Sequence, residues 1–380
     1  MQLSQFIEAA RLPKTGEAYE CRRVFKLACS GGRVDGGRLV RAVFEGLEPE
    51  RPVLHVESDD KGFEASVSDA LGAGVRVGGW RSFFEVGGPF RRLEGEGLSA
   101  WLDRVRADAY DWPDPGEAAE AAVRGFLERV KGLAEGRFLI LKVLGPTETA
   151  EGFFAPPSGG RGWELGQVLH RYGFGSLYVL RRGEALRIYE RIAGVILEVV
   201  KAGAELDAVD AVRVADDAAT YSGPSYSWSF YEEAYLPWHE RIASAVRRAG
   251  KYAILHCDGD LRKGGLLERL ARLYDGLHPL DLSPKSTPAE AHKWVGEVVE
   301  ARRIAGDAVF FTGAPIDLIF NDSVGLEDFL RVPLQLLEVH GPRRLVVATT
   351  HSEYPGRSYR EELPRRKVLA LREALLRRRV

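Results

Sequence analysis

A regular alternation of short apolar runs with helical segments is the feature of this sequence that most restricts its fold. From residue 117 onward, nearly every apolar run is separated from the next by a stretch with helical spacing. Strands that alternate with helices in this way form parallel sheets with right-handed crossovers. The expected strands are 53–57, 138–144, 211–215, 252–256, 276–281, 308–312 and 345–350.

These seven strands predict a closed barrel. An eighth strand is expected within 58–112, an irregular segment punctuated by Gly and Pro. Eight such units form an α/β fold of the (β/α)8 TIM type, here distorted, with an insertion after the first strand; a doubly wound open sheet is the alternative. No Gly-x-Gly-x-x-Gly or Walker motif follows any strand, which weighs against nucleotide-binding folds. We therefore predict an N-terminal extension at 1–36 and a single barrel domain at 37–380.

Charge and cysteine content narrow the class of protein. The 53 basic and 55 acidic residues nearly cancel, so nothing indicates binding to nucleic acid or to an anionic membrane. The three cysteines, Cys21, Cys29 and Cys257, are too few for a disulfide framework. The N-terminus has no apolar signal-peptide region, and no apolar run has the length of a membrane span. We expect a cytoplasmic protein, and the single Asn and single Met favour a thermophilic source.

Polar side chains gather at the ends of the expected strands, which is where active sites of (β/α)8 enzymes lie. Their types are those that serve as acids, bases or metal ligands. They are His256, Cys257, Asp258 and Asp260 after 252–256, Asp216 and Asp217 after 211–215, His351 after 345–350, Glu57 in 53–57 and Glu148 after 138–144.

Several short motifs lie along the chain. They are Tyr110-Asp-Trp-Pro-Asp-Pro115, Gly145-Pro146, Asp216-Asp217, Gly223-Pro224, Tyr235-Leu-Pro237, His256-Cys-Asp-Gly-Asp260, Gly276-Leu-His-Pro279 and Thr312-Gly313. Their order and spacing resemble the uroporphyrinogen decarboxylase superfamily over about residues 38–375. That superfamily has a distorted TIM-type barrel and includes the haem-pathway decarboxylase and zinc-dependent, corrinoid-linked methyltransferases. The resemblance implies an enzyme, and it suggests a homodimer.

The decarboxylase branch implies removal of carbon dioxide, without a cofactor, from a carboxylated, tetrapyrrole-like small molecule. Thr350-His351-Ser352 resembles the Gly-His-Gly of that branch, so His351 and one of the two aspartates are expected to handle protons and ring N–H groups. His256 and Asp258 are expected to line the same mouth. The residues predicted to be catalytic are Asp216, Asp217, His256 and His351.

If the protein belongs to the decarboxylase branch, we expect carboxylates and loop arginines to bind the substrate. The Arg-rich segment that holds substrate carboxylates in the decarboxylase has no counterpart here. A crowd of carboxylates at the mouth repels a substrate with many carboxylates unless a metal or arginines offset them. The residues predicted to bind substrate are Glu57, Glu148, Asp258, Asp260, Arg161 and Arg357.

The methyltransferase branch is the first alternative. Its members bind zinc through a His-x-Cys at the equivalent strand end and a distant second Cys. Here His256 matches, Asp258 stands in place of the first Cys, and no Cys lies downstream, so the predicted metal ligands are His256, Cys257 and Asp258. This reading implies zinc, a methylated substrate and a corrinoid protein as partner. A non-catalytic binder of a tetrapyrrole or corrinoid is the second alternative.

Overall fold

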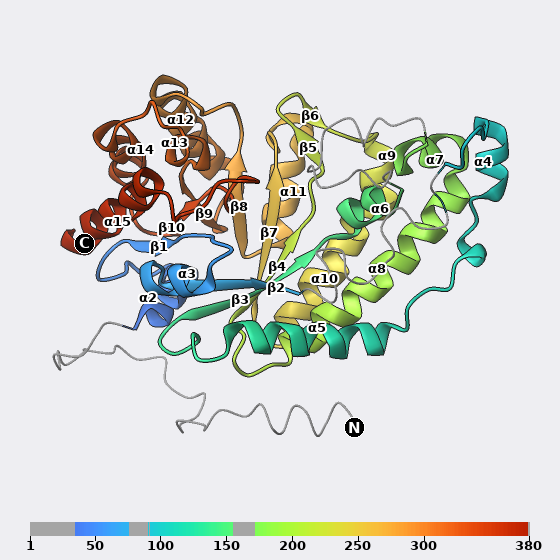
Figure 1. Cartoon of the computed structure of the whole chain (residues 1–380), viewed down its shortest axis with the longest axis horizontal. Coiled ribbons are helices and arrows are strands. Elements are labelled where there is room, and N and C mark those ends of the chain that lie inside the picture. Colours follow the sequence, from blue (N-terminus) through green and yellow to red (C-terminus); the bar gives the residue numbers. More distant parts are fainter. Residues whose placement is uncertain (1–34, 76–89, 91, 155–171, 379–380) are drawn as a thin grey trace.

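Eight parallel strands form the centre of the computed structural model, which describes residues 35–75, 90, 92–154 and 172–378 (Figure 1). The strand order is β1-β10-β9-β8-β7-β4-β3-β2, and every hydrogen-bonded pair in this sheet is parallel. The strands are β1 (Val53–His55), β2 (Ala70–Gly74), β3 (Phe138–Leu144), β4 (Ala211–Ala215), β7 (Tyr252–Asp258), β8 (Gly276–Asp281), β9 (Val309–Ala314) and β10 (Leu345–Thr349).

The two end strands, β1 and β2, meet through the polar turn before β2. The Asp69 amide donates to the Leu54 carbonyl at 2.8 Å, and the Asp69 carboxylate accepts from the Leu54 amide at 3.0 Å. The Ser68 hydroxyl accepts from the Val56 amide at 2.8 Å. These contacts satisfy strand edges that would otherwise stay unpaired, and they nearly close the sheet into a barrel.

Helices cover the outside of the strands. Figure 1 shows α12–α15 on one side of the barrel and α5, α8 and α10 on the other. The outward-facing strand residues, such as Leu139, Leu141 and Val143, belong to the large core between sheet and helices. The longer helices are α5 (Pro115–Val130), α8 (Arg182–Ala204), α10 (Leu236–Arg248), α11 (Leu266–Leu273), α12 (Pro288–Ala305), α14 (Leu326–His340) and α15 (Glu362–Arg377).

The structure also contains shorter elements. They are α2 (Gly36–Phe44), α3 (Lys61–Val67), α4 (Leu98–Arg104), α6 (Pro146–Phe154), α7 (Phe174–Leu180), α9 (Trp228–Phe230), α13 (Ile316–Ile319), the two-stranded β5 (Ala219–Thr220) and β6 (Gly223–Pro224), and the helical turns η1 (Ala107–Ala109), η3 (Tyr231–Tyr235) and η4 (Lys263–Gly265).

Helix α2 closes the amino end of the barrel. The Asp35 side chain caps it by accepting from the Gly37 amide at 2.8 Å. Its apolar face packs with the inward-facing residues at the amino ends of the strands in a second, smaller core. That core consists of Leu39, Val40, Val43 and Phe44 from α2 with Val53, Ala70, Phe138, Ile140, Ala211, Ile254, Val309, Phe311, Val346 and Ala348.

The predicted (β/α)8 fold is confirmed. The strand expected within 58–112 is β2, and the irregular segment follows it, so one helix and one strand separate β1 from that segment. The extension expected at 1–36 lies outside the described residues, apart from its last two residues. None of the helices described combines the length and the apolar character that a bilayer crossing needs.

Candidate functional site

The inside of the barrel changes from apolar to charged along the strands. Side chains of a strand alternate between its two faces, so every second residue points inward. On β4 this series begins with Ala211 in the smaller core and continues with Arg213; on β7 it begins with Ile254 and continues with His256 and Asp258. The chemistry of the barrel is therefore concentrated at its carboxyl end, where β/α enzymes place their active sites.

Glu57 is the anion at the centre of this charged layer. Its carboxylate is 3% exposed and accepts hydrogen bonds from Lys142 Nζ at 2.8 Å and Arg213 Nη2 at 3.1 Å, while Arg213 Nη1 contacts its other oxygen. Gly72 makes room for the lysine, because a Cβ there would lie 2.3 Å from Lys142 Cε. Glu57, predicted to bind substrate, is thus already paired with two buried cations.

Two histidines lie beside this ion pair. His256 Nδ1 is 2.6 Å from His278 Nδ1, and the rings are stacked with centroids 4.8 Å apart. His278 Nε2 lies 2.9 Å from the Thr349 carbonyl oxygen, and Arg213 Nη1 lies 3.5 Å from His278 Nδ1. Burial lowers the pKa of both imidazoles well below its usual value, and the neighbouring positive charges add to this effect. Both rings are therefore neutral near pH 7.

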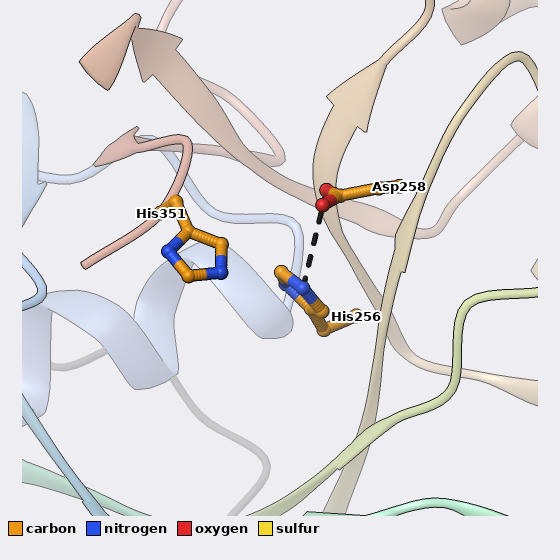
Figure 2. A group of neighbouring side chains, drawn as sticks. All are labelled: His256, Asp258 and His351. Carbon is orange, nitrogen blue, oxygen red and sulfur yellow. Dashed lines mark ion pairs between the residues drawn. The ribbon is translucent and has the colours of Figure 1, made fainter. Parts of the chain in front are cut away.

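His256, Asp258 and His351 form the group that faces the mouth (Figure 2). One nitrogen or oxygen atom from each residue lies within 4.8 Å of the corresponding atoms of the other two. His256 Nε2 is 3.9 Å from Asp258 Oδ1, and the His351 ring meets the His256 ring edge to face, with centroids 5.8 Å apart. Figure 2 shows all three side chains directed toward one another from two different strand ends. Strands β7 and β10 therefore supply one convergent set of donor atoms.

Two further carboxyl groups, those of Asp217 and Glu148, adjoin this group. The Asp217 Oδ1 atom accepts from the Asp258 amide at 2.8 Å. Burial and the nearby Asp258 raise the pKa of Asp217 to about 8, and burial raises the pKa of Asp258 to about 6. Burial and Asp217 likewise raise the pKa of Glu148 well above its usual value. Negative charge is costly at this mouth, so a bound cation would be stabilised there.

Asp216 has a different environment from Asp217. It is fully buried, and its carboxylate accepts from the Thr147 amide at 3.1 Å and the Glu148 amide at 2.7 Å, the first turn of α6. His239 Nε2 lies 2.9 Å from Asp216 Oδ2, and Tyr274 OH lies 2.5 Å from His239 Nδ1. Asp216 thus caps a helix from a neighbouring strand and does not face the mouth.

Cys257 lies on the outer face of β7. It belongs to the core between sheet and helices, and its Sγ accepts from the Ala218 amide at 3.2 Å. Burial raises the pKa of its thiol well above the usual value. The structure brings His256 and Asp258 together with His351, whereas Cys257, the third predicted metal ligand, points away from them.

The other predicted substrate-binding residues lie apart from this group. Asp260 is ion-paired with Arg262 Nε at 2.9 Å. Arg357 is held by Asp322 at 3.0 Å and Glu361 at 2.7 Å, and it lines a groove of about 580 Å³ between the loops after β1 and β10. Arg161 lies outside the described residues.

Sequence reasoning missed the polar residues behind the site. His278, Lys142 and Arg213 are not among the predicted site residues. A further buried cation, Lys285, contacts Asp281 and lies 3.7 Å from Asp317 beside the same mouth. His278, Lys142 and Arg213 are polar residues at positions where the alternation of side chains along a strand points them inward. This pattern in the sequence could have identified them.

The fold and site together define a (β/α)8 barrel with a histidine and carboxylate group at its carboxyl end. No family model matches the sequence, and no curated protein matches it. Among solved structures the chain is similar to a methyltransferase from Methanosarcina mazei, with a TM-score of 0.54 and 14% identity, over 90% of this chain and 100% of that chain.

Two glycosidases are also similar in structure. An endo-β-1,4-mannanase from Thermotoga petrophila has a TM-score of 0.44 and 12% identity, over 88% of this chain and 77% of that one. A β-glucosidase from Pyrococcus furiosus has a TM-score of 0.44 and 12% identity, over 83% and 82% of the two chains. At 14% identity, the likeness to the methyltransferase shows a shared fold.

Proposed function

We propose that this protein is a metal-dependent methyltransferase that binds zinc through His256, Asp258 and His351 and transfers a methyl group to a thiol. The observation that carries the proposal is the convergence of these three donor atoms within 4.8 Å of one another at the mouth of the barrel. The methyltransferase from Methanosarcina mazei, which shares the fold over the whole of its own length, supports the choice of reaction.

The donor set suits a catalytic zinc. Such sites use three protein ligands, commonly His with Asp or Glu, and leave a fourth position for a reacting group. Ligand atoms of tetrahedral zinc are roughly 3.4 Å apart when the bonds are about 2.1 Å long, so the three side chains must close slightly around an ion. His351 can make this adjustment, since it is exposed and its Nδ1 has only 3.3 Å and 3.4 Å contacts, both to Ser352.

The charges around the site also favour a cation. Besides burial, Asp258 raises the pKa values of both Asp217 and Glu148, and Asp217 raises that of Glu148, which measures the cost of leaving these charges uncompensated. Arg213 and Lys285 lower the pKa of Asp258, but they are paired with Glu57 and Asp281, and the pKa of Asp258 still stands at about 6. A divalent ion at the mouth would lower the electrostatic free energy of these carboxylates.

The reaction is a displacement in which a sulfur–carbon bond forms while the bond from the methyl carbon to its donor breaks. The electron pair of the broken bond stays on the leaving group, and the proton of the thiol must be removed. When bound, zinc supplies a Lewis acid that lowers the pKa of an acceptor at its open position. Asp217 is the proposed base, because its pKa of about 8 leaves part of it ionised at neutral pH and ready to accept that proton.

Cofactor-independent decarboxylation is the second candidate, and the raised pKa values of Glu148 and Asp217 favour it. At neutral pH a carboxyl group of this kind keeps its proton and can donate it to a carbon that has lost carbon dioxide. The first candidate is preferred because Lys142, Arg213 and Lys285, the described cations nearest the mouth, are already ion-paired, so they are poorly placed to anchor a substrate with several carboxylates.

Metal analysis combined with two assays tests the proposal. Purified protein is expected to contain one zinc per chain by inductively coupled plasma mass spectrometry, and His256→Ala is expected to lose it. Methylation of a thiol by methylcobalamin, a corrinoid methyl donor, should stop after chelation and return with zinc. Cys257→Ala is the matched control, because its thiol faces away from the site. Metal-free protein that releases carbon dioxide from a porphyrinogen would contradict the methyltransferase proposal and support decarboxylation.

A further inference from the structure

The buried contacts of His278 determine which nitrogen of His256 is free. His278 Nε2 lies 2.9 Å from the Thr349 carbonyl oxygen and 3.5 Å from a Glu57 oxygen. A carbonyl oxygen and a carboxylate oxygen can only accept hydrogen bonds. His278 Nε2 therefore carries a proton.

The other nitrogen of His278 is an acceptor. Arg213 Nη1, which can only donate, lies 3.5 Å from His278 Nδ1. Arg213 is fixed there because Glu57 binds both of its terminal nitrogens. A buried imidazole that donates from Nε2 and stands beside a guanidinium is neutral, so its Nδ1 atom carries a lone pair.

This arrangement leaves one tautomer for His256. Its Nδ1 atom is 2.6 Å from the lone pair on His278 Nδ1, so His256 Nδ1 must carry the proton and donate it. His256 Nε2 then presents its lone pair toward Asp258 Oδ1, which is 3.9 Å away, and toward His351. A free Nε2 lone pair is what a metal ion or a proton requires of histidine.

We infer that His278 is a positioning residue that holds His256 as the Nδ1-protonated tautomer, with its Nε2 lone pair directed into the site. The chain of contacts runs from Glu57 through Arg213 and His278 to His256, and it ties the segment after β1 to β4, β8 and β7 behind the mouth. The consequence for metal affinity rests on the proposed function, whereas the tautomer itself does not.

Nuclear magnetic resonance of the metal-free, 15N-histidine-labelled protein tests the tautomer directly. Long-range proton–nitrogen correlations distinguish a protonated ring nitrogen from one with a lone pair, and the His256→Gln spectrum assigns the signals. We expect His256 to be protonated at Nδ1 and His278 at Nε2. A His256 ring protonated at Nε2 in the wild-type protein would overturn the inference, and this outcome needs no variant of His278 to fold.

Two variants of His278 test the effect on the metal. His278→Leu removes the acceptor, and zinc affinity is expected to fall by about 10- to 100-fold, as for other residues that orient metal ligands. His278→Asn can place its amide oxygen near the same position, where Arg213 and His256 both donate, and should retain most of the affinity. His292→Leu is the control, because His292 pairs with Gln335 on the outer helices.

The outcomes separate this inference from the proposed function. If the wild-type protein binds no zinc, the proposed function fails and the tautomer measurement still decides the inference. If the wild-type protein binds zinc and His278→Leu binds it equally well with a melting temperature close to that of the wild type, the positioning role is refuted while the metal site stands. Unfolding of both His278 variants leaves the wild-type spectrum as the deciding measurement.

Discussion

Replacing Glu57 by Gln is expected to destabilise the protein more than any surface change of the same kind. The substitution keeps the size of the side chain but removes the anion that faces Lys142 and Arg213. The side chains of these two cations are only 17% and 7% exposed, so water can replace little of the lost interaction. Removing one partner of a buried ion pair costs about 3–5 kcal/mol, because it leaves an uncompensated charge in the interior.

This free energy converts into a measurable shift in melting temperature. For 380 residues the entropy of unfolding is roughly 0.8 kcal/mol per degree, at about 2.1 cal/mol/K per residue, so the loss corresponds to about 4–6 °C. Differential scanning calorimetry measures it. Glu50→Gln is the matched control, because the Arg38–Glu50 pair is 42% and 52% exposed and such pairs contribute about 0–1 kcal/mol. Equal melting temperatures for the two variants would refute the account of the buried pair.

Three further predictions concern individual site residues. Asp216→Ala should lower the free energy of unfolding by about 2–4 kcal/mol in urea denaturation, because it leaves buried amides of α6 unpaired, and it should leave the zinc content unchanged. Loss of zinc at unchanged stability would contradict the helix-capping role. In the metal-free protein, stability should fall as pH rises from about 4 to about 8, because the Asp217 carboxyl ionises near pH 3.8 in the unfolded chain and near pH 8 in the folded one. Thermal scans of Asp217→Asn should show a smaller fall over this pH range. An unaltered slope would show that Asp217 is not the titrating group. Cys257→Ala should keep one zinc per chain, and the native Cys257 thiol, 1% exposed, should not react with a thiol reagent until the protein unfolds. Because Cys21 and Cys29 also carry thiols, peptide mass mapping locates the label, and rapid labelling of Cys257 in the native protein would refute its burial.

The strands that sequence predicts best are those buried on both faces. The run 138–144 matches β3, and 252–256 matches most of β7, because both faces of each strand are covered and both runs are apolar apart from Lys142 and His256. The strand β2 was harder to place. Its sequence, Ala70-Leu-Gly-Ala-Gly74, contains two glycines and no β-branched residue, and it forms a strand through its parallel pairing with β3.

The rule that active-site residues follow strand ends predicted which segments meet at the mouth. It could not distinguish Asp216 from Asp217, since both follow β4. The alternation of side chains along a strand does distinguish them. Arg213 points inward, so Asp217 continues the inward series and Asp216 does not; on β7 the same count turns Cys257 outward between His256 and Asp258.

The buried network behind the site was beyond sequence reasoning. Arg213, His278 and His256 come from three strands and Glu57 from the segment after β1, and their contacts depend on how the strands are staggered around the barrel. The spacing of residues along the chain gives no information about this stagger. A polar side chain at an inward strand position shows that a partner is needed, but only the closed sheet shows which partner meets it.

Anomalous diffraction from crystals grown with zinc tests the central claim most directly. Data collected on either side of the zinc absorption edge locate the ion without assumptions about its ligands. A single strong peak is expected, bonded to His256 Nε2, an Asp258 carboxylate oxygen and a His351 nitrogen, and it should disappear in His256→Ala. A peak elsewhere on the chain, or no peak at the barrel mouth of the wild-type protein, would contradict the metal site proposed here.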